Sequence, residues 1–122
     1  MDNNDERVLS DLKKILISKQ LTNVTFVMDY LQLFFEGNVF NIYVFPEILV
    51  NKIKYNINDK GYRDAICELI SQNVSIIEWI EDLSIKIILQ NENTITFNLA
   101  PHSTPYEKLM FVTSENGMYF WD

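Results

Sequence analysis

Apolar residues along the chain follow two different periods, one typical of helices and one typical of strands. Spacings of three and four predict a helix over residues 6–18 and a second helix after Asp59, which is a plausible N-cap residue. The predicted apolar stripes consist of Leu9, Leu12, Ile15 and Leu16 in the first helix and of Tyr62, Ala65, Ile66, Leu69 and Ile70 in the second. Each helix is followed by segments in which apolar and polar residues alternate, as they do in half-buried strands.

Three strands are predicted after each helix. They cover residues 22–28, 30–36 and 39–45 in the first half and residues 73–80, 83–90 and 94–99 in the second. Polar turns within these sets favour antiparallel hairpins. A final hairpin is predicted at 108–122, because Asn116 and Gly117 between apolar segments favour a tight turn. A further short strand is one interpretation of residues 48–55.

The two halves share this order because the sequence itself is repeated. Residues 16–22 (LISKQLT) recur at 69–75 (LISQNVS), and similar matches relate 31–35 to 85–89 and 39–46 to 94–101. A repeat of this size indicates a duplicated supersecondary unit. We therefore expect an α+β fold in which two pseudo-repeats, each a helix plus three antiparallel strands, share one core and are followed by a C-terminal β-hairpin. The expected boundaries are 6–46 for repeat 1, 47–58 for a linker, 59–101 for repeat 2 and 108–122 for the hairpin.

The composition favours one domain over two. The chain has 122 residues, of which 48% are hydrophobic, so it can build one core, whereas one repeat alone would bury little. Cys67 is the one cysteine, which rules out an internal disulfide and is compatible with a reducing cytosol. The chain starts with acidic and polar residues and has no apolar run of the roughly 18 residues that a membrane span needs. We therefore expect a single soluble domain, 1–122, in the cytoplasm.

The net charge of −7 is unevenly distributed along the chain. Residues 1–60 contain eight acids and seven bases, whereas residues 61–122 contain nine acids and three bases. Repulsion from phosphates argues against direct binding of nucleic acid. A basic protein partner is favoured instead, chiefly through faster association, although many soluble proteins are mildly acidic without such a partner.

Side chains that carry out chemistry are scarce. His102 is the one histidine, and Cys67 lies among apolar helix residues, where a packed thiol is inert, so no convincing nucleophile–base pair can be assembled. Glu78, Glu81 and Asp82 are close in sequence, but an exposed turn explains them better than a metal site does. Three glycines are too few for a phosphate-binding loop. We therefore expect no enzymatic activity, catalytic residue, metal or cofactor.

Large aromatic side chains are frequent, and most of them are expected in the core. In the strand predicted at 30–36, Phe34 is apolar although it lies on the face opposite to Leu31, Leu33 and Phe35. Such a strand is either covered on both faces or part of a contact surface. The aromatic residues expected at an interface are Tyr30, Phe34, Tyr43, Trp79 and Tyr119.

Three short motifs carry a resemblance to known proteins. They are Leu69-Ile70-Ser71 with Val74, residues 31–37 (LQLFFEG) and residues 41–46 (NIYVFP). They resemble a widespread group of small bacterial proteins with the pattern LIGxxV, LxLxFxxG and LxIYNP, in which glycine stands at the positions of Ser18 and Ser71. That group is similar to immunity proteins encoded beside interbacterial toxins, including contact-dependent inhibition systems. The resemblance implies a cytoplasmic protein that binds and blocks one toxin domain, with no catalytic residues to carry over.

The leading hypothesis is therefore an immunity protein that neutralises a cognate toxin domain, a basic nuclease, by occlusion. The residues expected to contact the toxin are Glu78, Trp79, Glu81, Asp82, Glu92, Glu107 and Glu115. Two alternatives stay open at this point. One is a structural or regulatory module that forms a homodimer through a strand edge or the Phe34 face. The other is a small-molecule binder with a pocket between the two copies.

Overall fold

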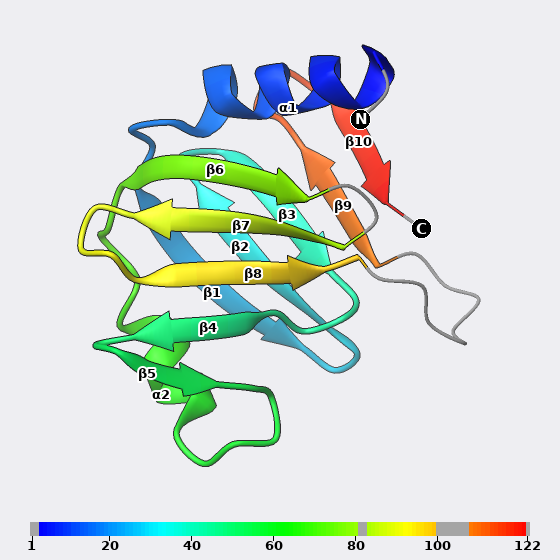
Figure 1. The fold of residues 1–122 in the computed structure, drawn as a ribbon. Coiled ribbons are helices and arrows are strands. Elements are labelled where there is room, and N and C mark those ends of the chain that lie inside the picture. Colours follow the sequence, from blue (N-terminus) through cyan, green and yellow to red (C-terminus); the bar gives the residue numbers. More distant parts are fainter. Residues whose placement is uncertain (1–2, 81–82, 100–107, 122) are drawn as a thin grey trace.

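The computed structural model describes residues 3–80, 83–99 and 108–121. Two helices and ten strands form two five-stranded antiparallel sheets, which do not close into a barrel, so the predicted α+β class is confirmed (Figure 1). The elements in chain order are α1 (Asn3–Leu16), β1 (Leu21–Val27), β2 (Tyr30–Phe35), β3 (Asn38–Ile42), β4 (Glu47–Val50), β5 (Ile53–Tyr55), α2 (Tyr62–Cys67), β6 (Val74–Ile80), β7 (Ser84–Leu89), β8 (Thr94–Asn98), β9 (Leu109–Val112) and β10 (Met118–Trp121).

Each half of the chain contributes strands to both sheets. The first sheet has the order β1-β2-β3-β9-β10, and the second has the order β5-β4-β8-β7-β6. The hairpin β4–β5 of the first half therefore extends the sheet of the second half. The hairpin β9–β10 of the second half extends the sheet of the first half. The segment expected to be a linker at 47–58 thus contains a hairpin that completes the second sheet.

One hydrophobic core lies between the inner faces of the sheets. Phe40 on β3 stacks on Phe111 of β9, with ring centroids 4.4 Å apart, and lies 4.9 Å from the ring of Phe97 on β8 in the other sheet. All three rings are almost completely buried. Aromatic rings at these separations stabilise each other beyond the area that they bury. Both halves are therefore joined through side chains of one core.

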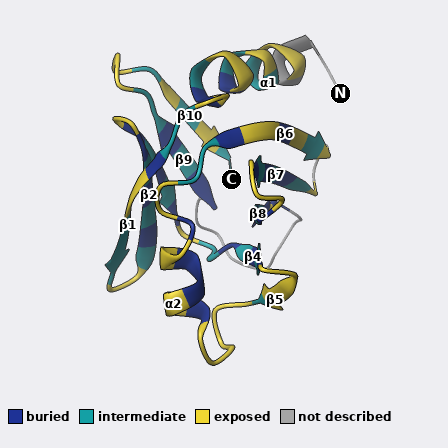
Figure 2. Cartoon of the chain, turned by 90° about the vertical axis from the view of Figure 1, so that its left-hand side faces the viewer, coloured by how far each residue is buried: buried dark blue, intermediate teal, exposed yellow. Residues whose placement is uncertain are grey.

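The helices cover two opposite sides of this sandwich and leave the outer sheet faces open. Helix α1 lies along β6 and β10, and α2 lies near β4 and β5 (Figures 1 and 2). In Figure 2 no described element lies outside either sheet. The stripe predicted for α1 is confirmed, because Leu12 and Leu16 are buried and Leu9 and Ile15 are packed against the core. The helices thus leave the outer faces of both sheets uncovered (Figure 2).

The second helix is shorter than its pattern predicts. It ends at Cys67, which is exposed and not packed as expected, and Ile70 is likewise 37% exposed. Its N-cap residue is Gly61, with φ of 90°, and no side chain caps it. The Asp59 carboxylate instead accepts a hydrogen bond of 2.7 Å from the backbone N–H of Asn56. Asp59 therefore closes a turn before the helix, a role that short polar side chains take as readily as capping.

The hairpins β9–β10 and β4–β5, which each extend the sheet of the other half, are each held by one buried asparagine of that half. Asn38, 3% exposed, accepts a hydrogen bond of 2.9 Å from the N–H of Ser114 in the β9–β10 turn. Asn93, 5% exposed, accepts one of 3.0 Å from the N–H of Asn51 in the β4–β5 turn. Because buried polar groups are stable only when paired, these contacts help to specify which sheet each hairpin joins.

Candidate functional site

The outer face of the first sheet is apolar across neighbouring strands. Phe34 of β2 pairs with Val39 of β3, which pairs with Val112 of β9, which pairs with Met118 of β10. Their side chains point away from the core, since their strand neighbours are buried or packed against it, namely Leu33, Phe35, Asn38, Phe40, Phe111 and Tyr119. The residues that we call the apolar face are Phe34, Val39, Met110, Val112, Met118 and Phe120, bordered by Tyr30 and Tyr43.

The next row across the same face is neutral. Gln32 donates a hydrogen bond of 2.8 Å to the Asn41 side chain, and Asn41 pairs with Met110, which pairs with Phe120. Met118 and Phe120 are 54% and 51% exposed. None of the five strands of the first sheet contains a charged residue. An exposed apolar surface without charges is typical of a binding surface.

The second sheet provides a comparison within the same molecule. Gln32 corresponds to Lys86 in the sequence repeat, and Lys86 pairs with Glu78 on β6 and with Thr96 on β8, which in turn pairs with Glu47. Charged residues therefore occupy this row of the second sheet, as on an ordinary solvated face. The second sheet does expose Ile76, Ile80 and Leu83 at one edge. The absence of charged residues within its five strands is what distinguishes the first sheet, since Lys108 lies just before β9 and is only 7% exposed.

The acidic residues predicted as partner contacts do not form one surface among the described residues. Glu78 lies on β6 of the second sheet, and Glu92 lies in the β7–β8 turn of that sheet, whereas Glu115 lies in the β9–β10 turn of the first sheet. All three are exposed. Glu81, Asp82 and Glu107, as well as the single histidine, lie outside the described residues.

Trp79, predicted as an anchor for a partner, faces the interior. Its ring meets that of Trp121 edge-on, with centroids 6.1 Å apart, and packs against the core. The Nε1 atom is buried and has no acceptor among the residues that the structure describes. A register shift between Val74 and Ile76 in β6 accounts for the misplaced prediction. Such a bulge reverses the alternation of side chains that follows it.

Three of the five aromatic residues predicted at an interface lie on or beside the apolar face. Phe34 is part of it, and the rings of Tyr30 and Tyr43 lie 5.5 Å apart at its border. Tyr119 points inward instead, and its hydroxyl donates a hydrogen bond of 3.1 Å to Asp11 on α1. Burial, followed by this hydrogen bond and the negative charge of Asp11, raises the pKa of Tyr119. The sequence indicates this surface through Phe34, an apolar residue on the face of its strand that is expected to be polar. It does not indicate the contributions of β9 and β10.

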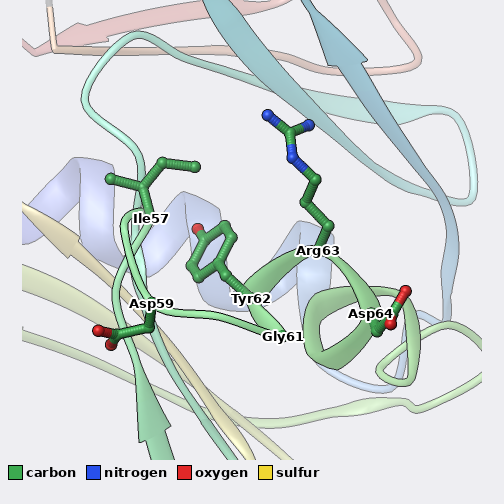
Figure 3. A pocket seen from close by; sticks show the side chains of 6 residues that line it. All are labelled: Ile57, Asp59, Gly61, Tyr62, Arg63 and Asp64. Carbon is green, nitrogen blue, oxygen red and sulfur yellow. The ribbon is translucent and has the colours of Figure 1, made fainter.

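A hollow beside α2 is the second candidate (Figure 3). Its volume is about 370 Å³, and its lining residues are Ile57, Asp59, Gly61, Tyr62, Arg63 and Asp64. The Tyr62 hydroxyl donates a hydrogen bond of 2.7 Å to the carbonyl of Pro46, and burial raises the pKa of Tyr62 far above its ordinary value. The Arg63 guanidinium lies over the Phe26 ring, 4.6 Å from its centroid. Both polar groups are thus engaged in holding α2, and the two carboxylates point away from each other (Figure 3).

The described residues contain no cluster of three His, Cys, Asp or Glu side chains that could hold a metal ion. Neither helix, over the part of the chain described, is long and apolar enough to cross a bilayer. No family model, curated protein or solved structure matches the chain. The resemblance to immunity proteins therefore stays a prediction based on three motifs.

Proposed function

We propose that the chain acts by binding another protein through the apolar face. The observation that carries this proposal is the row of Phe34, Val39, Val112 and Met118 on a sheet whose strands hold no charged residue. Burial of apolar surface contributes about 25 cal/mol per Å². Aromatic and methionine side chains are enriched where partners meet. Because the face is built on paired strands, little conformational entropy is lost when a partner docks.

We propose more specifically that the chain is an immunity protein that acts in the cytoplasm and neutralises a cognate toxin domain, a basic nuclease, by occlusion. The motif resemblance and the net charge of −7 support this assignment. Occlusion requires a rigid complementary surface and no reacting group. The apolar face supports this proposal because it is a rigid surface built on paired strands.

We also propose that the two halves are copies of one duplicated unit around a shared core. The repeated sequence supports this idea, as does the same order of helix, three-stranded meander and exchanged hairpin in each half. In a crystal structure, residues 16–46 should superpose on 69–101. A different strand order in the two ranges would contradict the duplication.

Co-expression with the toxin domain encoded by the neighbouring gene tests the proposed function. We expect the chain to restore growth and to elute with the toxin domain as one complex from a sizing column. An unrelated acidic protein of similar size serves as the control for charge alone. Continued toxicity together with separate elution of the two proteins would refute the assignment.

A further inference from the structure

The hairpin turns of the first sheet are uniformly acidic. The β1–β2 turn contains Asp29, the β2–β3 turn contains Glu36 and the β9–β10 turn contains Glu115, and none of these three turns contains a base. All three side chains are exposed, and none forms an ion pair with a residue of the described part of the chain. The apolar face is therefore bordered by carboxylates at both ends of its strands.

Two lysines approach this border from the side of α1. Lys14 and Lys19 line a hollow of about 260 Å³ together with Glu36 and Glu115. They do not contact these carboxylates closely enough for an ion pair among the described residues. Asp29, at the opposite end of the strands, is not part of that hollow. Lys14 and Lys19 thus reduce the negative field at the end of the face that holds Glu36 and Glu115. A base also lies at the opposite end, because Lys108, 7% exposed, directly precedes β9 and pairs through its backbone with Tyr43 and Trp121.

We infer that the apolar face takes a protein surface whose apolar centre is surrounded by Lys and Arg side chains, and not a second copy of this chain. The inference rests on the proposed function and specifies its partner. Opposite charges around an apolar centre accelerate association and exclude partners with the wrong sign. A basic border on the partner would meet Asp29, Glu36 and Glu115 while its apolar centre covers Phe34 and Met118.

A second copy fits the same face poorly for electrostatic reasons. In a two-fold dimer both copies present the same patch, so the carboxylates of both borders would gather around one interface. Each copy also carries a net charge of −7. Like charges brought together across an interface are unfavourable. The face is therefore expected to be free when the chain is alone in solution.

The first arm of the test measures the chain alone by sedimentation equilibrium in about 0.15 M salt, a concentration at which charges within about 8 Å still interact. We expect a monomer for the unmodified chain and for Phe34→Asp. A dimer that Phe34→Asp converts to a monomer would overturn the inference, because the second copy would then be the occupant of the apolar face.

The second arm compares two triple variants that remove the same charge from different sheets. D29N/E36Q/E115Q removes three carboxylates from the border of the apolar face. E47Q/E78Q/E92Q removes three carboxylates from the second sheet. Both variants have a net charge of −4, which is −7 plus three. The probe is the toxin domain encoded by the neighbouring gene, and the readout is the association rate constant at two salt concentrations.

We expect the first triple variant to associate about tenfold more slowly and to lose most of its salt dependence, because steering depends on charges near the contact. The association rate constant of E47Q/E78Q/E92Q should stay within about twofold of that of the unmodified chain. If only E47Q/E78Q/E92Q slows association with the toxin domain, the inference is overturned, whereas the proposed function still holds. If no complex forms with the unmodified chain, the proposed function fails, and the inference fails with it.

Discussion

Ser18 and Ser71 hold the two halves together through reciprocal backbone hydrogen bonds. Ser18 donates its N–H to the carbonyl of Val74, and Ser71 donates its N–H to the carbonyl of Leu21, both at 2.8 Å. Both serines have positive φ, 72° and 82°. Each follows a helical segment, at the kind of position where glycine usually ends a helix in the left-handed conformation. The junction is thus the same on both sides and does not depend on the serine side chains.

Replacement of these serines by glycine should stabilise the protein. A residue with a Cβ atom in the left-handed region costs about 1 kcal/mol or more, and glycine does not. We expect Ser18→Gly and Ser71→Gly each to raise the free energy of unfolding in urea by about 1 kcal/mol. Ser10→Gly, in the exposed interior of α1, is the control and should lower it by about 0.5 kcal/mol. A loss of stability in both junction variants would contradict this account.

Removal of the buried Asn38 side chain should destabilise the fold. Asn38 donates a hydrogen bond of 2.9 Å to the carbonyl of Phe35 and accepts one from Ser114, so Asn38→Ala leaves two backbone groups unpaired. We expect a loss of about 2 kcal/mol in chemical unfolding. Asn91→Ala, an exposed turn residue, should change stability by less than about 0.5 kcal/mol. Equal effects of the two changes would show that Asn38 does not anchor the β9–β10 hairpin.

The stability contributed by Tyr62 should disappear at high pH. Burial raises the pKa of Tyr62 in the folded state above its ordinary value of 10.0, so the contribution is complete below pH 10 and falls as the unfolded chain ionises above it. Relative to Tyr62→Phe, the unmodified chain should be more stable by about 1 kcal/mol at pH 7, because its hydroxyl bonds to Pro46.

That advantage should decrease by about 1.4 kcal/mol per pH unit above pH 10. Unfolding curves of both proteins between pH 7 and pH 11 measure this decrease. Because both proteins contain the other tyrosines, the contributions of those tyrosines cancel in the comparison. An advantage that stays constant up to pH 11 would mean that Tyr62 is not ionised more easily after unfolding.

Local patterns in the sequence predict the strands well but not their partners. Period-two alternation and the Asn116–Gly117 turn identify β9 and β10 as a hairpin. The pairing of β9 with β3 and of β4 with β8 is determined by tertiary contacts, such as those of the two buried asparagines. These contacts connect residues that are far apart in the chain, so no local period reveals them.

The apolar face could be predicted only in part for a similar reason. Phe34 was detectable because a single apolar residue broke the alternation of its strand. The acids of residues 61–122 are numerous in sequence, yet Glu78 and Glu115 belong to different sheets. Strict alternation along 73–80 predicts Trp79 at the surface, because the bulge in β6 is not visible in the sequence pattern.

Docking through the apolar face is tested most directly by two matched pairs of substitutions. Met118 and Phe120 on β10 are 54% and 51% exposed, and Ile76 and Ile80 at the edge of the second sheet are 50% and 55% exposed. Replacing either pair by aspartate adds the same charge to an outward-facing edge strand. Circular dichroism and thermal unfolding of both variants show whether each is folded.

Isothermal titration with the toxin domain then gives the affinity of each folded variant. We predict that M118D/F120D weakens binding at least about 100-fold, because apolar side chains that become buried against a partner carry most of the binding energy. We predict that I76D/I80D binds like the unmodified chain. Unchanged affinity of M118D/F120D, or a loss confined to I76D/I80D, would contradict docking through the apolar face.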